Sequence, residues 1–104
     1  MIARMWGGWA SGENAAAYEE HFRSQVLREL SRVPGYRRAE LLRREDGVET
    51  EIVVVTRFES MDAIRAFAGV DPEAAVVAKG ARELLSRFED RVRHYEVVAL
   101  PNDA

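Results

Sequence analysis

Hydrophobic and polar positions alternate or recur along the first third of the chain in two distinct patterns. Alternation over residues 2–10 predicts a strand, in which Gly7 and Gly8 indicate a bulge or a close backbone approach. Over residues 13–32, apolar side chains recur every four positions, which predicts an amphipathic helix. Ser11 is the expected N-cap, and residues 33–35 (Val-Pro-Gly) end the helix. The apolar stripe consists of Tyr18, Phe22, Val26 and Leu30.

The middle of the chain predicts two strands joined by a tight turn. Residues 36–45 alternate loosely and are rich in arginine, as suits an edge strand protected by charge. Asp46 and Gly47 form a strong signal for a two-residue hairpin turn. Residues 48–58 contain the continuous apolar run 52–55, which is typical of a strand buried on both faces.

A second helical connection follows. Ser60 predicts the N-cap of a helix that ends at Gly69. Pro72 stands at the expected first position of another helix, because a proline there loses no hydrogen bond. Residues 79–80 are expected to interrupt that helix before the apolar positions Leu84, Leu85 and Phe88 form a last turn or two.

The last strand is expected from residue 91 or 92 to residue 100, so the element order is βαββαβ. Right-handed crossovers would fold this order into a four-stranded antiparallel sheet, with strands in the order 4-1-3-2 and helices on one face. The sequence therefore predicts an α+β, ferredoxin-like fold. We expect one domain over residues 1–104, with a frayed tail at 101–104.

Composition removes several classes of protein from consideration. The chain has 104 residues, is 47% hydrophobic and 32% charged, and carries a net charge of −3. It has no cysteine, which excludes disulfides and thiolate metal sites, and its two scattered histidines give little support for any metal. The acidic balance argues against nucleic acid as a partner. No stretch approaches the ~18 consecutive apolar residues that a membrane-spanning helix needs. Residues 1–4 are followed by alternating residues and not by the apolar core of a signal peptide. We therefore expect a cytoplasmic protein without a membrane partner.

The predicted sheet is apolar on both faces, although its helices can cover only one. Val53 and Val55 point away from the side of Ile52 and Val54, and Trp9 points away from the side of Trp6. An uncovered apolar face of this size favours association. The simplest cover is a second copy, which makes a homodimer through the sheet face. The alternative is that the tail or the long second connection covers it.

Four segments resemble one known family. They are Trp6-Gly7, the turn at 33–36, the run 54–69 from the third strand into a Ser-capped helix, and the closing segment 92–97. Together they are similar to the antibiotic biosynthesis monooxygenase domain of the dimeric α+β barrel superfamily. The resemblance implies a dimer formed through the sheets, with a pocket between sheet and helices in each protomer. It also implies cofactor-free oxygenation of phenols or quinols by O₂, although the superfamily hosts other activities.

The haem-degrading branch of that family matches less well. That branch pairs an asparagine near the end of the first strand with a tryptophan at the end of the third and a histidine on a later helix. This chain has Trp9 near the end of its first strand, Phe58 at the end of its third, and Asn14 only in the following helix. Haem degradation is therefore the less favoured interpretation.

Two residues are the candidate catalytic groups. His94, on the last strand, is a candidate base for a phenolic proton, since imidazole titrates near neutral pH. Arg57, at the end of the third strand, is a candidate for holding the resulting anion. The alternatives are an interface histidine and an arginine paired with a nearby glutamate. His21, one position off the apolar stripe, is expected at the surface.

Aromatic side chains could line a flat substrate cavity, although the same spacing also suits an ordinary core. The sequence thus favours a cofactor-independent monooxygenase that acts on a small aromatic or polyketide-like substrate, with neither cofactor nor metal. The alternative is a non-redox dimeric barrel protein, either a small-molecule binder or a cyclase or isomerase. The candidate substrate-binding residues are Trp6, Tyr18, Phe22, Tyr36, Phe58 and Phe67.

Overall fold

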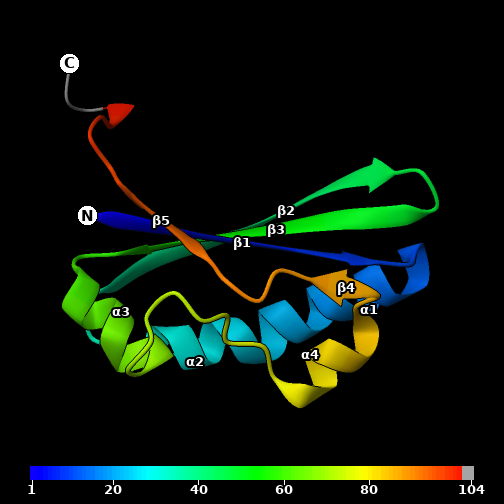
Figure 1. The fold of residues 1–104 in the computed structure, drawn as a ribbon, viewed down its shortest axis with the longest axis horizontal. Helices are drawn as coiled ribbons and strands as arrows, with labels where there is room; N and C mark the ends of the chain where they lie inside the picture. The colour runs from blue at the N-terminus through cyan, green and yellow to red at the C-terminus, as the bar shows by residue number, and fades with distance from the viewer. Residues whose placement is uncertain (102–104) are drawn as a thin grey trace.

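The computed structural model describes residues 1–101. They form one antiparallel sheet with helices along one of its faces (Figure 1). The sheet order is β2-β3-β1-β4, and β5 also pairs with β1, which confirms the predicted α+β, ferredoxin-like fold. The strands are β1 (Ile2–Ala10), β2 (Tyr36–Asp46), β3 (Glu49–Phe58), β4 (Arg87–Phe88) and β5 (Arg93–Glu96). The helices are α1 (Gly12–His21), η1 (Phe22–Val26), α2 (Leu27–Ser31), α3 (Met61–Ala68) and α4 (Lys79–Leu84).

The first connection is one long helix with a π-helical middle. Ser11 caps its start by accepting from Asn14 N–H, as predicted. Within η1, the Leu27 N–H donates to Phe22 O, five residues back. An apolar stripe spaced every four residues drifts around an α-helix of 3.6 residues per turn, and the wider π turn absorbs that drift. The stripe therefore stays on the sheet along the whole helix.

The central strands pair along their full length, from Ile2 opposite Phe58 to Ala10 opposite Thr50. Gly7 makes no bulge, but it does allow a close approach, because a Cβ there would lie 2.9 Å from Glu89 Oε1. The β2–β3 turn lies one residue later than predicted. Gly47 takes a φ of +67°, and Asp46 still belongs to β2.

The predicted helix starting near Pro72 is wrong. Residues 70–78 form no helix, and α4 begins at Lys79, where an interruption was expected. The reason is that this stretch pairs with a distant segment instead. Ala75 N–H donates to Asp90 O, and Val92 N–H donates to Glu73 O. These bonds hold the backbone extended, so the local helix signal is overridden.

The last strand is shorter than predicted and broken into β4 and β5. Between them the chain leaves β1 to pair with residues 73–75. β5 ends at Glu96 because its partner there, Ile2, is the first residue of β1. Val97 N–H still reaches Met1 O, after which β1 offers no backbone to pair with. The tail expected to fray lies outside the described residues from Asn102 onwards.

The two faces of the sheet differ as the alternation predicted. Ile52 and Phe58 point to the helices and are fully buried. Val53 and Val55 point to the other face and are only half-buried. Figure 1 shows all the labelled helices on one side of the sheet; we call that side the covered face and the opposite side the uncovered face. Within residues 1–101, no helix is long and apolar enough to cross a membrane.

Candidate functional site

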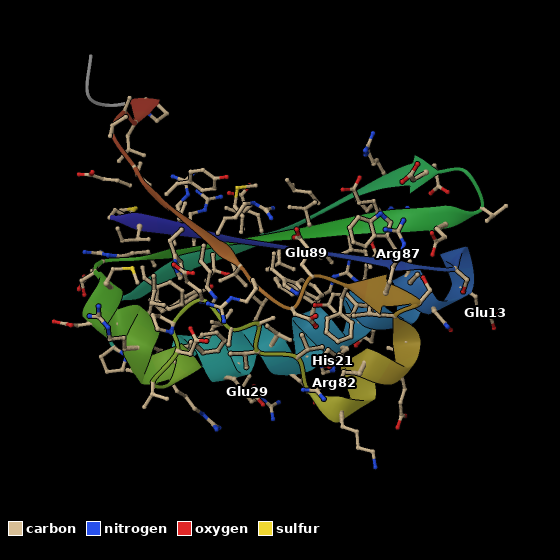
Figure 2. The ribbon with its side chains drawn as sticks, in the orientation of Figure 1. Glu13, His21, Glu29, Arg82, Arg87 and Glu89 are labelled. Carbon is tan, nitrogen blue, oxygen red and sulfur yellow. The ribbon has the colours of Figure 1, made fainter. Side chains whose placement is uncertain are left out.

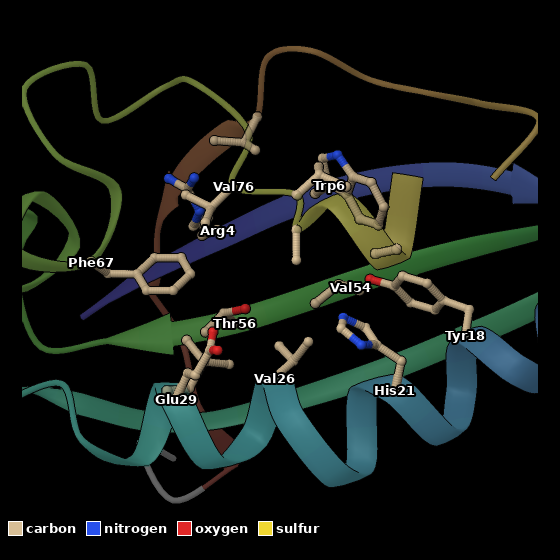
Figure 3. Close-up of a pocket in the computed structure, with 15 residues that line it drawn as sticks. Arg4, Trp6, Tyr18, His21, Val26, Glu29, Val54, Thr56, Phe67 and Val76 are labelled. Atoms are coloured by element: carbon tan, nitrogen blue, oxygen red, sulfur yellow. The ribbon is translucent and has the colours of Figure 1, made fainter. Parts of the chain in front are cut away.

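A cavity of about 190 Å³ lies between the covered face and the long helix of the first connection (Figure 3). Strand alternation supplies its floor, because Arg4 and Trp6 of β1 lie opposite Thr56 and Val54 of β3. The other walls come from the long helix, from Phe67 of α3 and from residues 76–78. Each half of the chain therefore contributes to the cavity.

Arg4 is the charged group of the cavity floor. Only 5% of it is exposed, and its guanidinium donates from Nη1 to Pro72 O and from Nη2 to Ala74 O, the second bond at 2.8 Å. It also lies over the ring of Phe67, with Cζ 5.6 Å from the ring centroid. Burial lowers the pKa of Arg4 to about 10, so it stays protonated at neutral pH. One residue thus provides a buried positive charge and anchors the segment that follows α3.

His94 lies beside Arg4 rather than on the cavity wall. Its Nε2 is 2.9 Å from Arg4 Nη1, and its ring is half-buried. Burial, followed by the neighbouring Arg4 charge, lowers the pKa of His94. The neutral ring therefore accepts a hydrogen bond from Arg4 Nη1 at its Nε2. This arrangement suits a positioning residue for Arg4, and the catalytic role of His94 stays a prediction.

Arg57 lies on the uncovered face. It is one position along β3 from Thr56, which faces the cavity, and it is opposite Ala3. Its Nε is buried without a hydrogen-bond partner among residues 1–101. The structure therefore does not bring Arg57 and His94 together in the cavity of one protomer. Arg4, and not Arg57, is the arginine that lines the cavity on the covered face.

The aromatic candidates divide into two groups. Trp6, Tyr18 and Phe67 line the cavity, and the rings of Trp6 and Tyr18 stack with centroids 6.1 Å apart. Burial raises the pKa of Tyr18 to about 12, which leaves its hydroxyl protonated. The other three are packed into the core beside the cavity, where Phe58 contacts both Tyr36 and Phe67. These three core residues are Phe22, Tyr36 and Phe58.

The long helix adds two polar groups that the sequence analysis did not place in a site. His21 and Glu29 both line the cavity, and both lie in the helical layer below the sheet (Figure 2). Glu29 is exposed and His21 is half-buried, so they mark the side of the cavity that opens to solvent. His21 was expected at the surface, but the π turn after it changes the direction in which the preceding helix faces. The strict four-residue spacing of the apolar stripe was the signal in the sequence for this π turn, because a plain α-helix would not keep such a stripe on one face.

The described residues form no metal-ligand cluster, and the cavity is small for haem. Residues 1–101 contain no group of three or more acidic or histidine side chains placed to hold a metal ion. Pockets for drug-sized ligands measure roughly 300–1,000 Å³, and haem needs more room than the cavity offers. The α3 helix carries no histidine, and His94 Nε2 already contacts Arg4, so His21 is the one imidazole of residues 1–101 that lines the cavity.

Comparison with known proteins identifies one family. Its description is antibiotic biosynthesis monooxygenase, and its sequence profile matches residues 1–79. No curated protein matches the chain in sequence.

Solved structures show the same fold. A candidate antibiotic biosynthesis monooxygenase from Bacillus cereus is similar at a TM-score of 0.67 and 14% identity, with 95% of this chain and 94% of that one covered. A second candidate, from Deinococcus radiodurans, gives 0.63 and 14%, with 98% and 97% covered. The haem degrader MhuD from Mycobacterium tuberculosis, with two haems in its active site, gives 0.59 and 22%, with 95% and 97% covered.

Proposed function

Because the chain belongs to the antibiotic biosynthesis monooxygenase family, we propose that it is a cofactor-independent monooxygenase acting on a small aromatic substrate with O₂. The observation that carries this proposal is an aromatic cavity with a buried cation at one side and an imidazole at another. Arg4 and His21 both line it, and Trp6, Tyr18 and Phe67 supply flat walls. Such a site can generate an organic anion and shield it from water.

The proposed chemistry needs only a base, a charge and oxygen. His21 takes a proton from an acidic C–H or phenol of the substrate, and Arg4 holds the oxygen on which negative charge develops. The electron-rich anion then reduces O₂. When a CH₂ group becomes a carbonyl, the substrate supplies all four electrons, one oxygen atom enters the product, and the other leaves as water. His94 positions the Arg4 guanidinium through its Nε2 contact.

Oxygen uptake in the presence of a metal chelator tests the function. With 1,4-naphthalenediols as substrates, we expect protein-dependent uptake of one O₂ per product. His21→Gln and Arg4→Gln are expected to lower kcat by about 10²-fold or more, in line with loss of a base or of an oxyanion donor. Arg65→Gln is the matched control, because Arg65 is an exposed side chain paired with Asp62.

The result that would overturn the proposal is saturable binding of these compounds with no oxygen consumption. That outcome would favour the non-redox alternative, in which the same base and cation move protons in a binder, cyclase or isomerase. Full activity of His94→Ala would leave the oxygenase intact and remove only the positioning role.

We also propose that the protein is a homodimer joined through the uncovered face. Apolar side chains on that face support it, including Leu42 and Tyr95, each 49% exposed. The unpartnered Arg57 Nε is a further polar group that a neighbouring copy would satisfy. Ferredoxin-like sheets with one bare apolar face gain most from pairing with a copy of themselves.

A further inference from the structure

Among residues 1–101, Arg4 is the one buried charged side chain, and it has no acidic partner there. The buried polar residues within 1–101 are Arg4, Thr50 and Thr56. The salt bridges of the described chain use other arginines, and in each one the arginine is largely exposed. A buried cation without a counter-ion is costly, and nearby anions are correspondingly favoured. An anion entering the cavity would therefore gain more from Arg4 than from an exposed arginine.

The guanidinium also has hydrogen bonds to spare. It carries five N–H groups, and its contacts with Pro72 O, Ala74 O and His94 Nε2 use three of them. One N–H on Nε and one on Nη2 remain without a partner among residues 1–101. Each of the three acceptors is neutral, so none of them cancels the charge. An oxyanion would satisfy both needs at once, since hydrogen bonds between ions are the strong ones.

The cavity volume limits what can accompany that anion. An apolar cavity of about 150 Å³ holds one benzene ring, while drug-sized ligands need roughly 300 Å³ or more. At about 190 Å³, this cavity has room for one or two fused rings but not three. Its walls include Trp6, Phe67 and Val54, which suit a flat apolar body. Glu29 at the solvent side disfavours a second negative group there.

We propose that the cavity selects aromatic monoanions of one or two rings, with the anionic oxygen on the two unused N–H groups of Arg4. This inference rests on the proposed function and names its substrate class. Tricyclic and larger compounds are too large for the cavity. Neutral isosteres bind more weakly, because they leave the charge of Arg4 unmet unless His21 ionises them, and Glu29 disfavours dianions.

Anaerobic binding to the full-length protein tests this selection without any turnover. The probes are 2-naphthoate, its neutral isostere 2-naphthamide, and anthracene-2-carboxylate, followed by calorimetry and tryptophan fluorescence. We expect 2-naphthoate to bind at least about 10-fold more tightly than the amide and the three-ring acid. Arg4→Gln is expected to remove 10- to 100-fold of the naphthoate affinity, as for a charged hydrogen bond. The matched variant Arg65→Gln is expected to change nothing.

Equal affinity for the acid and the amide would overturn the role of Arg4, and tight binding of the three-ring acid would overturn the size limit. Both comparisons use the wild-type protein, so they stand even if Arg4→Gln does not fold. Selective binding of 2-naphthoate without oxygen uptake from any substrate would overturn the proposed monooxygenase function and leave the selectivity for aromatic anions standing. Oxygen uptake from anthrone with no binding of 2-naphthoate would support the monooxygenase function and overturn that selectivity.

Discussion

The two faces of the sheet are built by the same strands but arranged differently. On the covered face, Arg4 and Thr56 lie buried among apolar side chains, and Arg4 has no carboxylate partner within the described part of the chain. On the uncovered face, Arg44 contacts Glu51 and Arg93 contacts Glu89, although Arg57 Nε has no hydrogen-bond partner among residues 1–101. An unpaired cation persists in a fold only where something else offsets its cost. This contrast is the physical basis for proposing a ligand on the covered face and a second copy of the chain on the uncovered face.

The largest expected effect is on stability. Phe58→Ala removes a fully buried ring from the covered face and is expected to lower the free energy of unfolding by about 3–5 kcal/mol. Val55→Ala, on the uncovered face, is expected to cost less than about 1 kcal/mol in the monomer, because Val55 is only half-buried. Urea unfolding at protein concentrations below the dissociation constant measures both. Equal losses would contradict the contrast between the faces.

Dimer formation should depend on the uncovered face, whereas the stability of one protomer depends mainly on the covered face. Val55→Glu places a charge in the middle of the uncovered face and is expected to raise the dimer dissociation constant at least about 100-fold, because that charge would be buried unpaired. Val48→Glu is the control, since Val48 lies in the β2–β3 turn and is 96% exposed. Sedimentation equilibrium gives the constants. A wild-type protein that remains monomeric at micromolar concentration would end the dimer proposal.

Gly7 tests how closely the uncovered face is packed within one copy. A Cβ at Gly7 would lie 2.9 Å from Glu89 Oε1, so Gly7→Ala must displace that carboxylate. We expect a loss of about 1 kcal/mol, kept small because the end of a glutamate side chain can move. A Cβ at Gly80 in α4 would meet no neighbouring atom within 4 Å. Gly80→Ala is therefore expected to raise the free energy of unfolding by up to about 1 kcal/mol, because alanine has the higher helix propensity. Thermal unfolding tests both expectations: the unfolding midpoint should fall for Gly7→Ala and rise for Gly80→Ala.

The smallest effect is a pH dependence that arises on the covered face. Because the folded pKa of His94 is lowered from 6.5, the unfolded chain binds a proton first as pH falls. Stability conferred by the neutral ring is therefore present above the unfolded pKa and declines as pH drops below about 6.5. His94→Gln is expected to flatten this part of the profile between pH 7.5 and 5. A variant whose unfolding free energy follows the wild type at every pH would contradict the assignment.

Most of the fold could be predicted because hydrophobic patterns and capping residues within short segments determine it. Alternation identified β1, the continuous apolar run 52–55 identified β3, and Ser60 and Gly69 correctly bounded α3. The second connection could not be predicted, because Pro72 carries a real helix signal that long-range pairing with residues 90–92 overrides. The break between β4 and β5 has the same origin. Neither pairing leaves a signature in a window of ten residues.

The candidate site was predicted less well than the fold. Trp6, Tyr18 and Phe67 do line the cavity, but whether they bind substrate stays a prediction. Arg57 was favoured because it follows an apolar strand, yet alternation places its side chain on the other face. The same alternation pointed to Arg4, which shares a face with Trp6. A charge in the middle of an otherwise apolar stripe was the clue available in the sequence.

The five-residue π turn gives the first connection an unusual dependence on chain length. Five residues in a π turn cover about the same rotation as four in an α-helix, so this turn holds one residue more than a plain helix would. Deleting a single residue from 22–26 would therefore restore a plain α-helix whose two halves keep their relative orientation. Deleting one residue from 13–20 would instead rotate the residues before it by about 100° about the helix axis. The same loss of one codon therefore has different consequences on the two sides of His21.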